Sequence, residues 1–150
     1  KWKDNIYNMS EESIDELWYA LGNETNESIM TLSTSRIKSL KNDMLQRLGL
    51  SGKELKIMHK KLKSYRYCSD MSDINFGCYI RWIPLKDPDK IKLTNGGIII
   101  DIDIINDCVQ IKVKNNMNRI FQIKFDECYI FQKLTNQENI ILGVLDYLEK

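Results

Sequence analysis

A chain of 150 residues is long enough for one compact core, or for two small subdomains that share an interface. Hydrophobic residues make up 43% and charged residues 29%, with only two prolines and seven glycines, which excludes a disordered chain. No apolar run is long enough to span a bilayer, and no amino-terminal pattern is typical of a signal peptide, so we expect no membrane partner.

The net charge of +1 conceals a strong segregation of charge along the chain. Residues 1–34 carry two Lys and seven Asp or Glu, whereas residues 35–66 carry ten Lys or Arg and only two acids. Residues 67–150 carry ten basic and twelve acidic residues. This asymmetry indicates a basic face for a polyanion, held between less basic neighbours.

Helical periodicity covers the first half of the chain. Ser10 is a candidate N-cap for a first amphipathic helix, and Gly22 is a candidate left-handed residue at its end. A second helical pattern runs from about residue 27 to residue 48, with a break allowed near residues 33–35, and Gly49 ends it.

A third helix has the most complete start signal. Ser51 is followed three residues later by Glu54, which is the capping-box pattern, and the helix is predicted to run to about Lys63. Lysines between the apolar positions would face water. The residues that the helix would bury are Leu55, Met58 and Leu62.

After Tyr67 the hydrophobic period changes from helical to alternating. The turn signals are Asn95-Gly96-Gly97 and the two-residue hairpin turn Asn106-Asp107, and Thr135 is a candidate cap for a terminal helix. Strands are predicted over residues 76–83, 98–105, 119–125 and 129–134, with a further strand after the hairpin turn.

The hairpin around Asn106-Asp107 has a specific predicted register, in which Asp101 faces Lys112 on one side of the sheet and apolar residues meet on the other. For the next strand to place its apolar residues on that same side, the loop around Asn116 must contain three or five residues, because a slip of one inverts every side chain. The predicted apolar pairs are Ile104–Val109, Ile102–Ile111 and Ile100–Val113.

These elements predict an α+β protein with two parts. Residues 1–66 would form an N-terminal helical subdomain, and residues 67–150 an antiparallel β unit with a C-terminal helix. Short strands with tight turns favour either a small, partly open barrel of the SH3-like kind or a meander covered by helices.

Residues Lys41 to Leu62 resemble the helix-turn-helix family, in which apolar side chains fix the packing of two helices and a glycine makes the turn between them. Gly49 stands at the turn, but Leu45 stands where that family has a small residue, which would hold the helices further apart. The resemblance implies that the helix from Lys53 to Lys63 lies in a major groove. The apolar positions that carry it are Met44, Leu48, Leu50, Leu55 and Met58.

The resemblance also implies a nucleic-acid contact surface. Lysine dominates over arginine in it, which favours attraction to phosphates over reading of bases. The alternative is an ordinary helical hairpin with a solvated lysine face. The candidate residues are Lys53, Lys56, His59, Lys60 and Lys63 on the helix, with Arg47, Lys61 and Arg66 as flanking phosphate contacts.

No catalytic constellation, metal site or cofactor motif is found, so we expect a protein that is not an enzyme. His59 is the only histidine, and no Ser, Cys or Asp has a spacing that ties it to a catalytic role. Asp101 and Asp103 indicate surface pairing with lysine rather than a metal pair. The four cysteines are too widely spaced for structural zinc and are expected to be reduced: Cys68, Cys78, Cys108 and Cys128.

Aromatic residues and arginine alternate around the first predicted strand, at Tyr65-Arg66-Tyr67 and at Tyr79, Arg81 and Trp82. Such an arrangement can form a stacking platform for single-stranded nucleic acid. It can equally close a barrel or bury a subunit interface.

Residues Tyr65 to Asp146 also resemble a small uncharacterised group of proteins from nucleocytoplasmic large DNA viruses. The resemblance rests on YIRWIPLKDPDKIKLTNGGI at 79–98, NRIFQIKFDECYIFQKL at 118–134 and LDYL at 145–148. It covers about half the chain, contains no known functional motif, and implies only a viral factory or virion context. The expected location is therefore the host cytoplasm, a viral factory, the nucleus or the virion.

Two hypotheses of function follow. The first is non-catalytic DNA binding, in which phosphate contacts through the Lys53 to Lys63 face provide most of the affinity and duplex is preferred to single strand. The second is a protein-interaction or assembly module, in which the β unit and the C-terminal helix form a homodimer or bind a viral partner.

Overall fold

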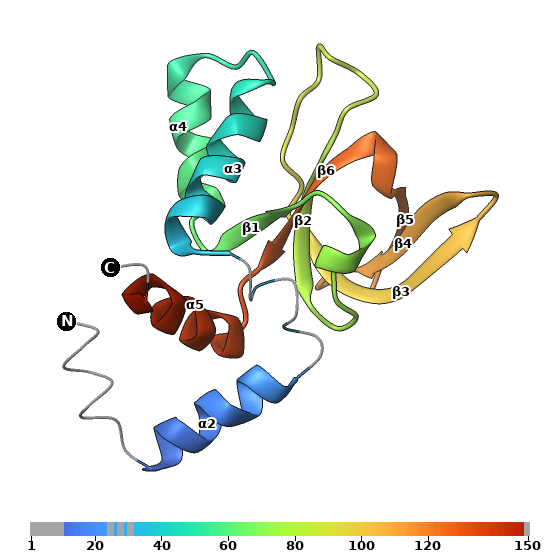
Figure 1. Ribbon diagram of the computed structural model, residues 1–150. Helices are drawn as coiled ribbons and strands as arrows, with labels where there is room; N and C mark the ends of the chain where they lie inside the picture. The colour runs from blue at the N-terminus through green and yellow to red at the C-terminus, as the bar shows by residue number, and fades with distance from the viewer. Residues whose placement is uncertain (1–10, 24–25, 27–28, 30–31, 149–150) are drawn as a thin grey trace. The chain divides into compact units, whose positions relative to one another are not determined.

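The computed structural model describes residues 11–23, 26, 29 and 32–148 and confirms the α+β class (Figure 1). The helices are α2 (Glu11–Gly22), α3 (Thr34–Gln46), α4 (Gly52–Lys61) and α5 (Asn136–Leu148), with short 3-10 turns η2 (Met71–Asp73) and η3 (Phe125–Glu127). The strands are β1 (Tyr65–Cys68), β2 (Tyr79–Pro84), β3 (Gly97–Ile105), β4 (Cys108–Lys114), β5 (Ile120–Lys124) and β6 (Cys128–Lys133). The predicted Ser10 cap lies outside the described residues, and Gly22 does not adopt the left-handed conformation expected of it.

The six strands form one antiparallel sheet in the order β1-β6-β2-β3-β4-β5. The sheet is open and does not close into a barrel. A barrel requires its first and last strands to pair, whereas β1 and β5 lie at opposite edges. The strands β2, β3, β4 and β5 follow one another as a meander, whereas β6 inserts between β1 and β2.

The division of the chain also differs from the predicted boundary at residue 66, which falls inside β1. One compact unit, here the α2–α5 unit, contains residues 1–38 and 134–150, and the other, here the sheet unit, contains residues 39–133. The terminal helix therefore does not belong with the sheet, and α4 does not belong with α2. The apolar residues of α4 and α5 pack against residues that are far away in the sequence.

In the α2–α5 unit, α5 packs against α2 through a small apolar core. The predicted Thr135 cap is confirmed: its Oγ1 accepts the backbone N–H of Glu138 at 3.1 Å, and the Glu138 carboxylate accepts the Thr135 N–H at 3.1 Å. Asp146 accepts the backbone N–H and the hydroxyl of Thr34. The buried members of the core are Ala20, Ile29, Ile37, Ile141 and Leu142.

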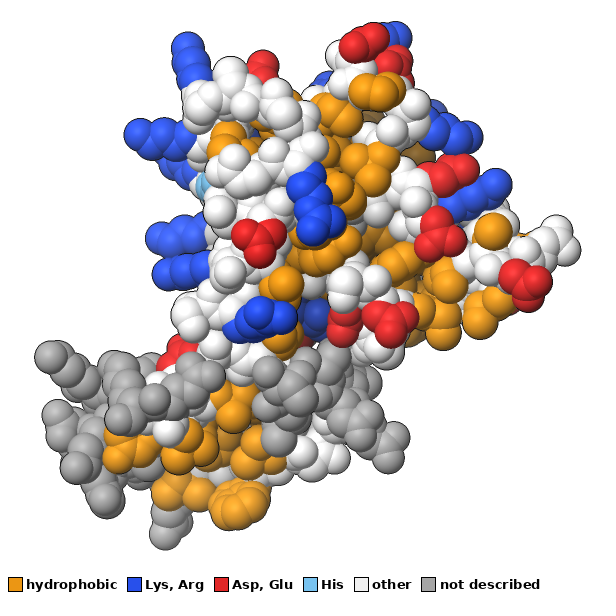
Figure 2. Space-filling view, turned by 45° about the horizontal axis from the view of Figure 1, so that its top comes forward, with side chains coloured by type: hydrophobic (Ala, Val, Ile, Leu, Met, Phe, Trp, Pro, Cys, Tyr) orange, Lys and Arg blue, Asp and Glu red, His pale blue; other side chains and the backbone are white. Residues whose placement is uncertain are grey.

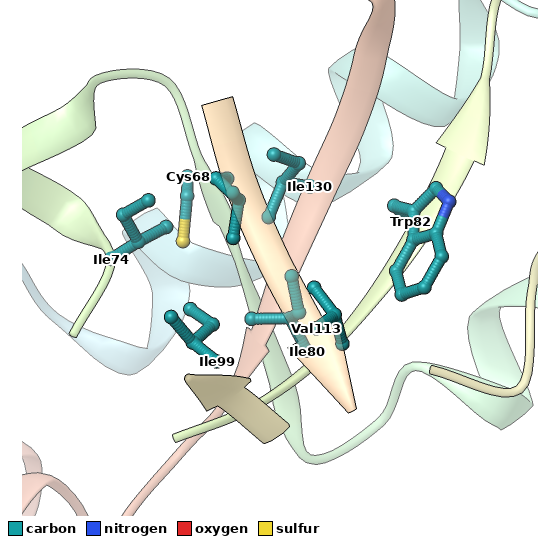
Figure 3. Packing of buried hydrophobic residues seen from close by; sticks show 8 residues of the cluster. Cys68, Ile74, Ile80, Trp82, Ile99, Val113 and Ile130 are labelled. Atoms are coloured by element: carbon teal, nitrogen blue, oxygen red, sulfur yellow. The ribbon is translucent and has the colours of Figure 1, made fainter. Parts of the chain in front are cut away.

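In the sheet unit, apolar residues fill both faces of the β1-β6-β2 region. One cluster lies on the face that carries Cys68, Ile130 and Trp82, together with side chains from β3 and β4 (Figure 3). The other face carries Phe131 and Ile83 and packs with residues of α3 and α4. Burial on both faces explains why these strands show near-continuous apolar runs rather than strict alternation.

The β3–β4 hairpin confirms most of the predicted register. Asn106 and Asp107 have φ values of 53° and 64°, as a type I′ turn requires, and Asp101 is opposite Lys112. The predicted Ile100–Val113 pair is wrong, because an irregularity between Ile99 and Asp101 shifts the register and Ile99 takes the place opposite Val113. The confirmed apolar pairs are Ile104–Val109 and Ile102–Ile111.

The predicted parity of the next loop is confirmed. Five residues, 115–119, separate β4 from β5, and the register places Phe121 opposite Val113 and Ile123 opposite Ile111. At the other turn, Gly96 has a φ of 85°, and a Cβ there would collide with the carbonyl oxygen of Ile80. The Gly96-Gly97 pair therefore allows β2 and β3 to approach each other closely.

The side chain of Lys41 joins α3 to the end of α4. It is only 5% exposed, and its Nζ donates to the carbonyl oxygens of Leu62 at 2.8 Å and Tyr65 at 2.9 Å. Leu62 is the C-cap of α4, where helix carbonyls lack intrahelical donors and a positive charge is favoured by the helix dipole. Lys41 thus supplies hydrogen-bond donors to backbone carbonyl groups at the point where the chain passes from α4 to β1.

We expect Lys41→Met to lower the free energy of unfolding by about 2–3 kcal/mol, because it keeps most of the aliphatic stem but removes the charge-assisted hydrogen bonds of the ammonium group. Urea denaturation measures this change. Lys38→Met, at an exposed position of the same helix, is the control and should change stability by less than about 0.5 kcal/mol. Equal stabilities for the two variants would show that the Lys41 contacts contribute nothing.

Candidate nucleic-acid interface

The turn between α3 and α4 is built as the sequence predicts. Gly49 has a φ of 67°, and Ser51 caps α4: its Oγ accepts the Glu54 N–H at 3.2 Å, while the Glu54 carboxylate accepts the Ser51 N–H at 3.4 Å. The helix ends at Lys61, slightly before the predicted end at Lys63, and Leu62 is its C-cap. A short, well-defined helix of ten residues results.

The inner side of α4 holds the predicted apolar residues. Met58 and Leu62 are buried and Leu55 is half-buried, in the cluster that also contains Phe131 of β6. Leu45 of α3 is fully buried in this cluster. The position that is small in helix-turn-helix proteins therefore carries a large core side chain here.

The outer side of α4 carries a row of lysines. Lys53, Lys56 and Lys60 are spaced three and four residues apart, so they lie on one face of the helix, and Lys63 follows in the turn after it. All four are exposed, and we call them the lysine face. Figure 2 shows Lys and Arg side chains projecting in a row from the part of the surface formed by α3 and α4.

The only acidic residue of α4, Glu54, is already engaged with the N-cap. It lies on the other flank of the helix, where it lines a depression of about 220 Å³ together with Ile57 and Lys61. Lys61 is exposed but belongs to this flank rather than to the lysine face. Arg47 is exposed in the turn before α4.

His59 is half-buried, and one ring nitrogen lies 3.2 Å from the side-chain oxygen of Asn42 on α3. Burial, and secondarily the positive charge of Lys41, lower the pKa of His59 below its ordinary value of 6.5. His59 is therefore neutral at pH 7. It joins α4 to α3 and adds no charge to the surface.

Arg66 is a correction to the sequence-based site. Its side chain is 1% exposed, and its guanidinium donates to the carbonyl oxygen of Asp73 at 2.6 Å. Arg66 lies on β1, on the face opposite the one that carries Tyr65 and Tyr67, because side chains alternate along a strand. It holds the β1–η2 connection and does not reach the surface.

The aromatic residues of β1 and β2 are internal contacts. Trp82 is buried and lies edge-on to Phe121, with ring centroids 6.2 Å apart. Tyr79 donates its hydroxyl to the Asn95 carbonyl at 2.8 Å, and Arg81 donates to the Thr94 carbonyl at 2.8 Å. These residues fasten the 85–96 segment to β2, so they do not form an open stacking platform.

The described residues do not assemble a metal site or a reactive thiol. No three His, Cys, Asp or Glu side chains gather there in a way that could hold a metal ion. Burial raises the pKa of Cys128 to about 11, so this thiol is not a thiolate nucleophile at neutral pH. Within the part of the chain that the structure describes, no helix is long and apolar enough to cross a membrane.

Comparison with known proteins gives no relative for this chain: no family model, no curated protein and no solved structure matches it.

We expect the His59 ring to titrate below pH 6.5, and an NMR titration can follow it because it is the only histidine. Since its pKa is lower in the folded than in the unfolded chain, the protein should lose stability as the pH falls from 6.5 through the folded value. His59→Gln should remove this part of the pH dependence. A ring that titrates at or above 6.5 would contradict the proposed burial against Asn42.

Proposed function

We propose that this protein binds duplex DNA without catalysing a reaction, through the lysine face of α4. The observation that carries the proposal is the separation of the two sides of α4. Apolar residues of one side are buried in the core, and the four ammonium groups of the lysine face are exposed, while Glu54, the only carboxylate of α4, is bonded to the N-cap on the other flank. Such a row of fixed positive charges attracts a polyanion.

The charges available to DNA are fewer than the sequence suggests. Of the ten basic residues in 35–66, Lys41 and Arg66 are buried and contribute to the fold. Of those that remain, Lys53, Lys56, Lys60 and Lys61 are held on α4 rather than on a flexible tail. We infer that binding depends on a small number of phosphate contacts whose loss can be measured one at a time.

We further propose that α3 and α4 act as a helix-turn-helix pair, with α4 along the major groove. The left-handed Gly49 and the capped start of α4 support this arrangement. Lysines bind phosphates as point charges, and Glu54 stands at the N-terminal end of α4, where such proteins reach base edges. Binding should therefore show little sequence preference, and a viral context would suit such a protein.

We expect the logarithm of DNA affinity to fall linearly with the logarithm of salt concentration, with a slope of about −3 to −4 for the four lysines. Lys56→Glu with Lys60→Glu should lower affinity at least about tenfold and reduce the slope by about two. Fluorescence anisotropy with labelled duplex of two unrelated sequences, and with single strand, measures both quantities.

The matched control replaces two exposed lysines elsewhere in the sheet unit, Lys90→Glu with Lys114→Glu, which changes the net charge by the same amount. If this control loses as much affinity as the α4 variant, the net charge and not the lysine face determines binding. If neither loses affinity, the DNA-binding proposal is wrong.

A further inference from the structure

The edge strand β5 has backbone hydrogen-bonding groups on its outer side that no other strand of the sheet pairs with. β5 pairs with β4 on one side and is the last strand of the sheet on the other (Figure 1). Edge strands are normally protected by proline, by a bulge or by inward-pointing charges. β5 has none of these, and its single charged residue, Lys124, stands at its end.

Apolar side chains near this edge are exposed. Ile120 is 61% exposed, Phe121 37% and Met117, in the preceding loop, 76%. Figure 2 shows hydrophobic side chains gathered over the adjoining β3–β4 hairpin, where Ile104 is 58% exposed. The apolar face of β3, β4 and β5 is buried at Ile111 and Val113 and becomes partly exposed toward the β5 edge, at Phe121.

Alternation along β5 separates two sets of residues. Phe121 and Ile123 lie on the apolar face, opposite Val113 and Ile111 of β4. Ile120, Gln122 and Lys124 lie on the other face, where Gln122 donates to the side chain of Gln110. Any strand added at this edge must bring apolar residues to the first face and must avoid a second lysine beside Lys124.

We propose that β5 pairs antiparallel with β5 of a second copy of this chain, around a two-fold axis at Gln122. This register places Phe121 opposite Ile123 of the second copy and Ile120 opposite Lys124. Gln122 faces its own counterpart. Apolar residues meet on one face, and no two like charges are directly opposed, so the strand is complementary to itself.

The register follows from the faces of the strand. A two-fold axis perpendicular to the sheet keeps each face on its own side, so the axis must pass through a residue position and not between two. An axis at Phe121 or at Ile123 would leave part of β5 without a partner. Only the axis at Gln122 pairs the strand along its whole length, from Ile120 to Lys124.

β5 of a second copy fits this edge better than β1 of a second copy does. β1 contains the buried Arg66 and Cys68, and its four residues could pair with only part of β5. Pairing β5 with β1 of the next molecule would use both edges of every molecule in turn and give open chains of molecules. Pairing β5 with itself closes at two copies and continues the sheet across both. This dimer gives the assembly hypothesis a specific surface, separate from the lysine face.

Sedimentation velocity over a concentration series tests the proposal. The full chain should show a reversible monomer–dimer equilibrium. Gln122→Lys, at an exposed position, would place two ammonium groups face to face on the axis and should weaken the dimer at least about tenfold. Gln122→Glu should weaken it similarly, and an equal mixture of the two variants should recover a dimer, because opposite charges then face each other.

The control is Asn116→Lys, which adds the same charge in the exposed loop before β5 and should leave the dimer unchanged. Circular dichroism confirms that each variant is folded. The proposal is overturned by a full chain that stays monomeric at all concentrations, by a Gln122→Lys variant that dimerises normally, or by a mixture that recovers nothing. Because Lys56 and Lys60 are not involved, their substitution should not change the dimer, so this test and the DNA-binding test fail independently.

Discussion

The buried ammonium group of Lys41 is the contact on which the arrangement of the candidate interface depends. It lies between two helices and the start of the sheet and donates to carbonyl oxygens at the point where α4 ends. A charge removed from water is costly unless its donors are satisfied, so the geometry around Nζ admits little variation. This group, together with the buried cluster of Leu45 and Met58, holds the orientation of α4 relative to α3, and therefore the direction in which its lysines project.

The same segment uses its basic residues in two different ways. Lys41 and Arg66 are inside, where each donates to backbone carbonyl oxygens and fixes the path of the chain. Lys53, Lys56, Lys60 and Lys63 are outside, where their side chains are exposed to water. A high density of positive charge in a sequence therefore does not translate directly into a charged surface, since part of it stabilises the scaffold that presents the rest.

Local signals in the sequence predicted the elements that depend on local chemistry. The capping box at Ser51, the Asn106-Asp107 turn and the odd length of the loop after β4 each follow from a few neighbouring residues. The sequence could not predict which strands pair, because β6 lies between β1 and β2. The residues of β1 and β6 that pair are more than sixty positions apart in the sequence. It also could not predict the irregularity at Ile100, since residues 98 to 100 are all isoleucine and such a run hides the position at which the alternation shifts.

The site was predicted in part for the same reason. Helical spacing is enough to separate the lysine face from Met58 and Leu62, but it says nothing about Arg66, whose four-residue strand has no apolar alternation to reveal it. Lys41 did leave a signal: it stands four residues after Ile37 and four before Leu45, both of which are buried. A lysine at that spacing on an apolar stripe indicates an ammonium group with internal acceptors.

The position of β6 in the middle of the sheet determines when the sheet can be completed during synthesis. β1 pairs with β6 alone, and β2 pairs mainly with β6, so both wait for residues 128–133 to leave the ribosome. Until then only the β2-β3-β4-β5 meander can form, with one edge of β2 still unpaired. While about half of its length is being synthesised, the nascent chain must therefore expose unpaired apolar strands. This is the interval in which chaperone binding protects it most from aggregation.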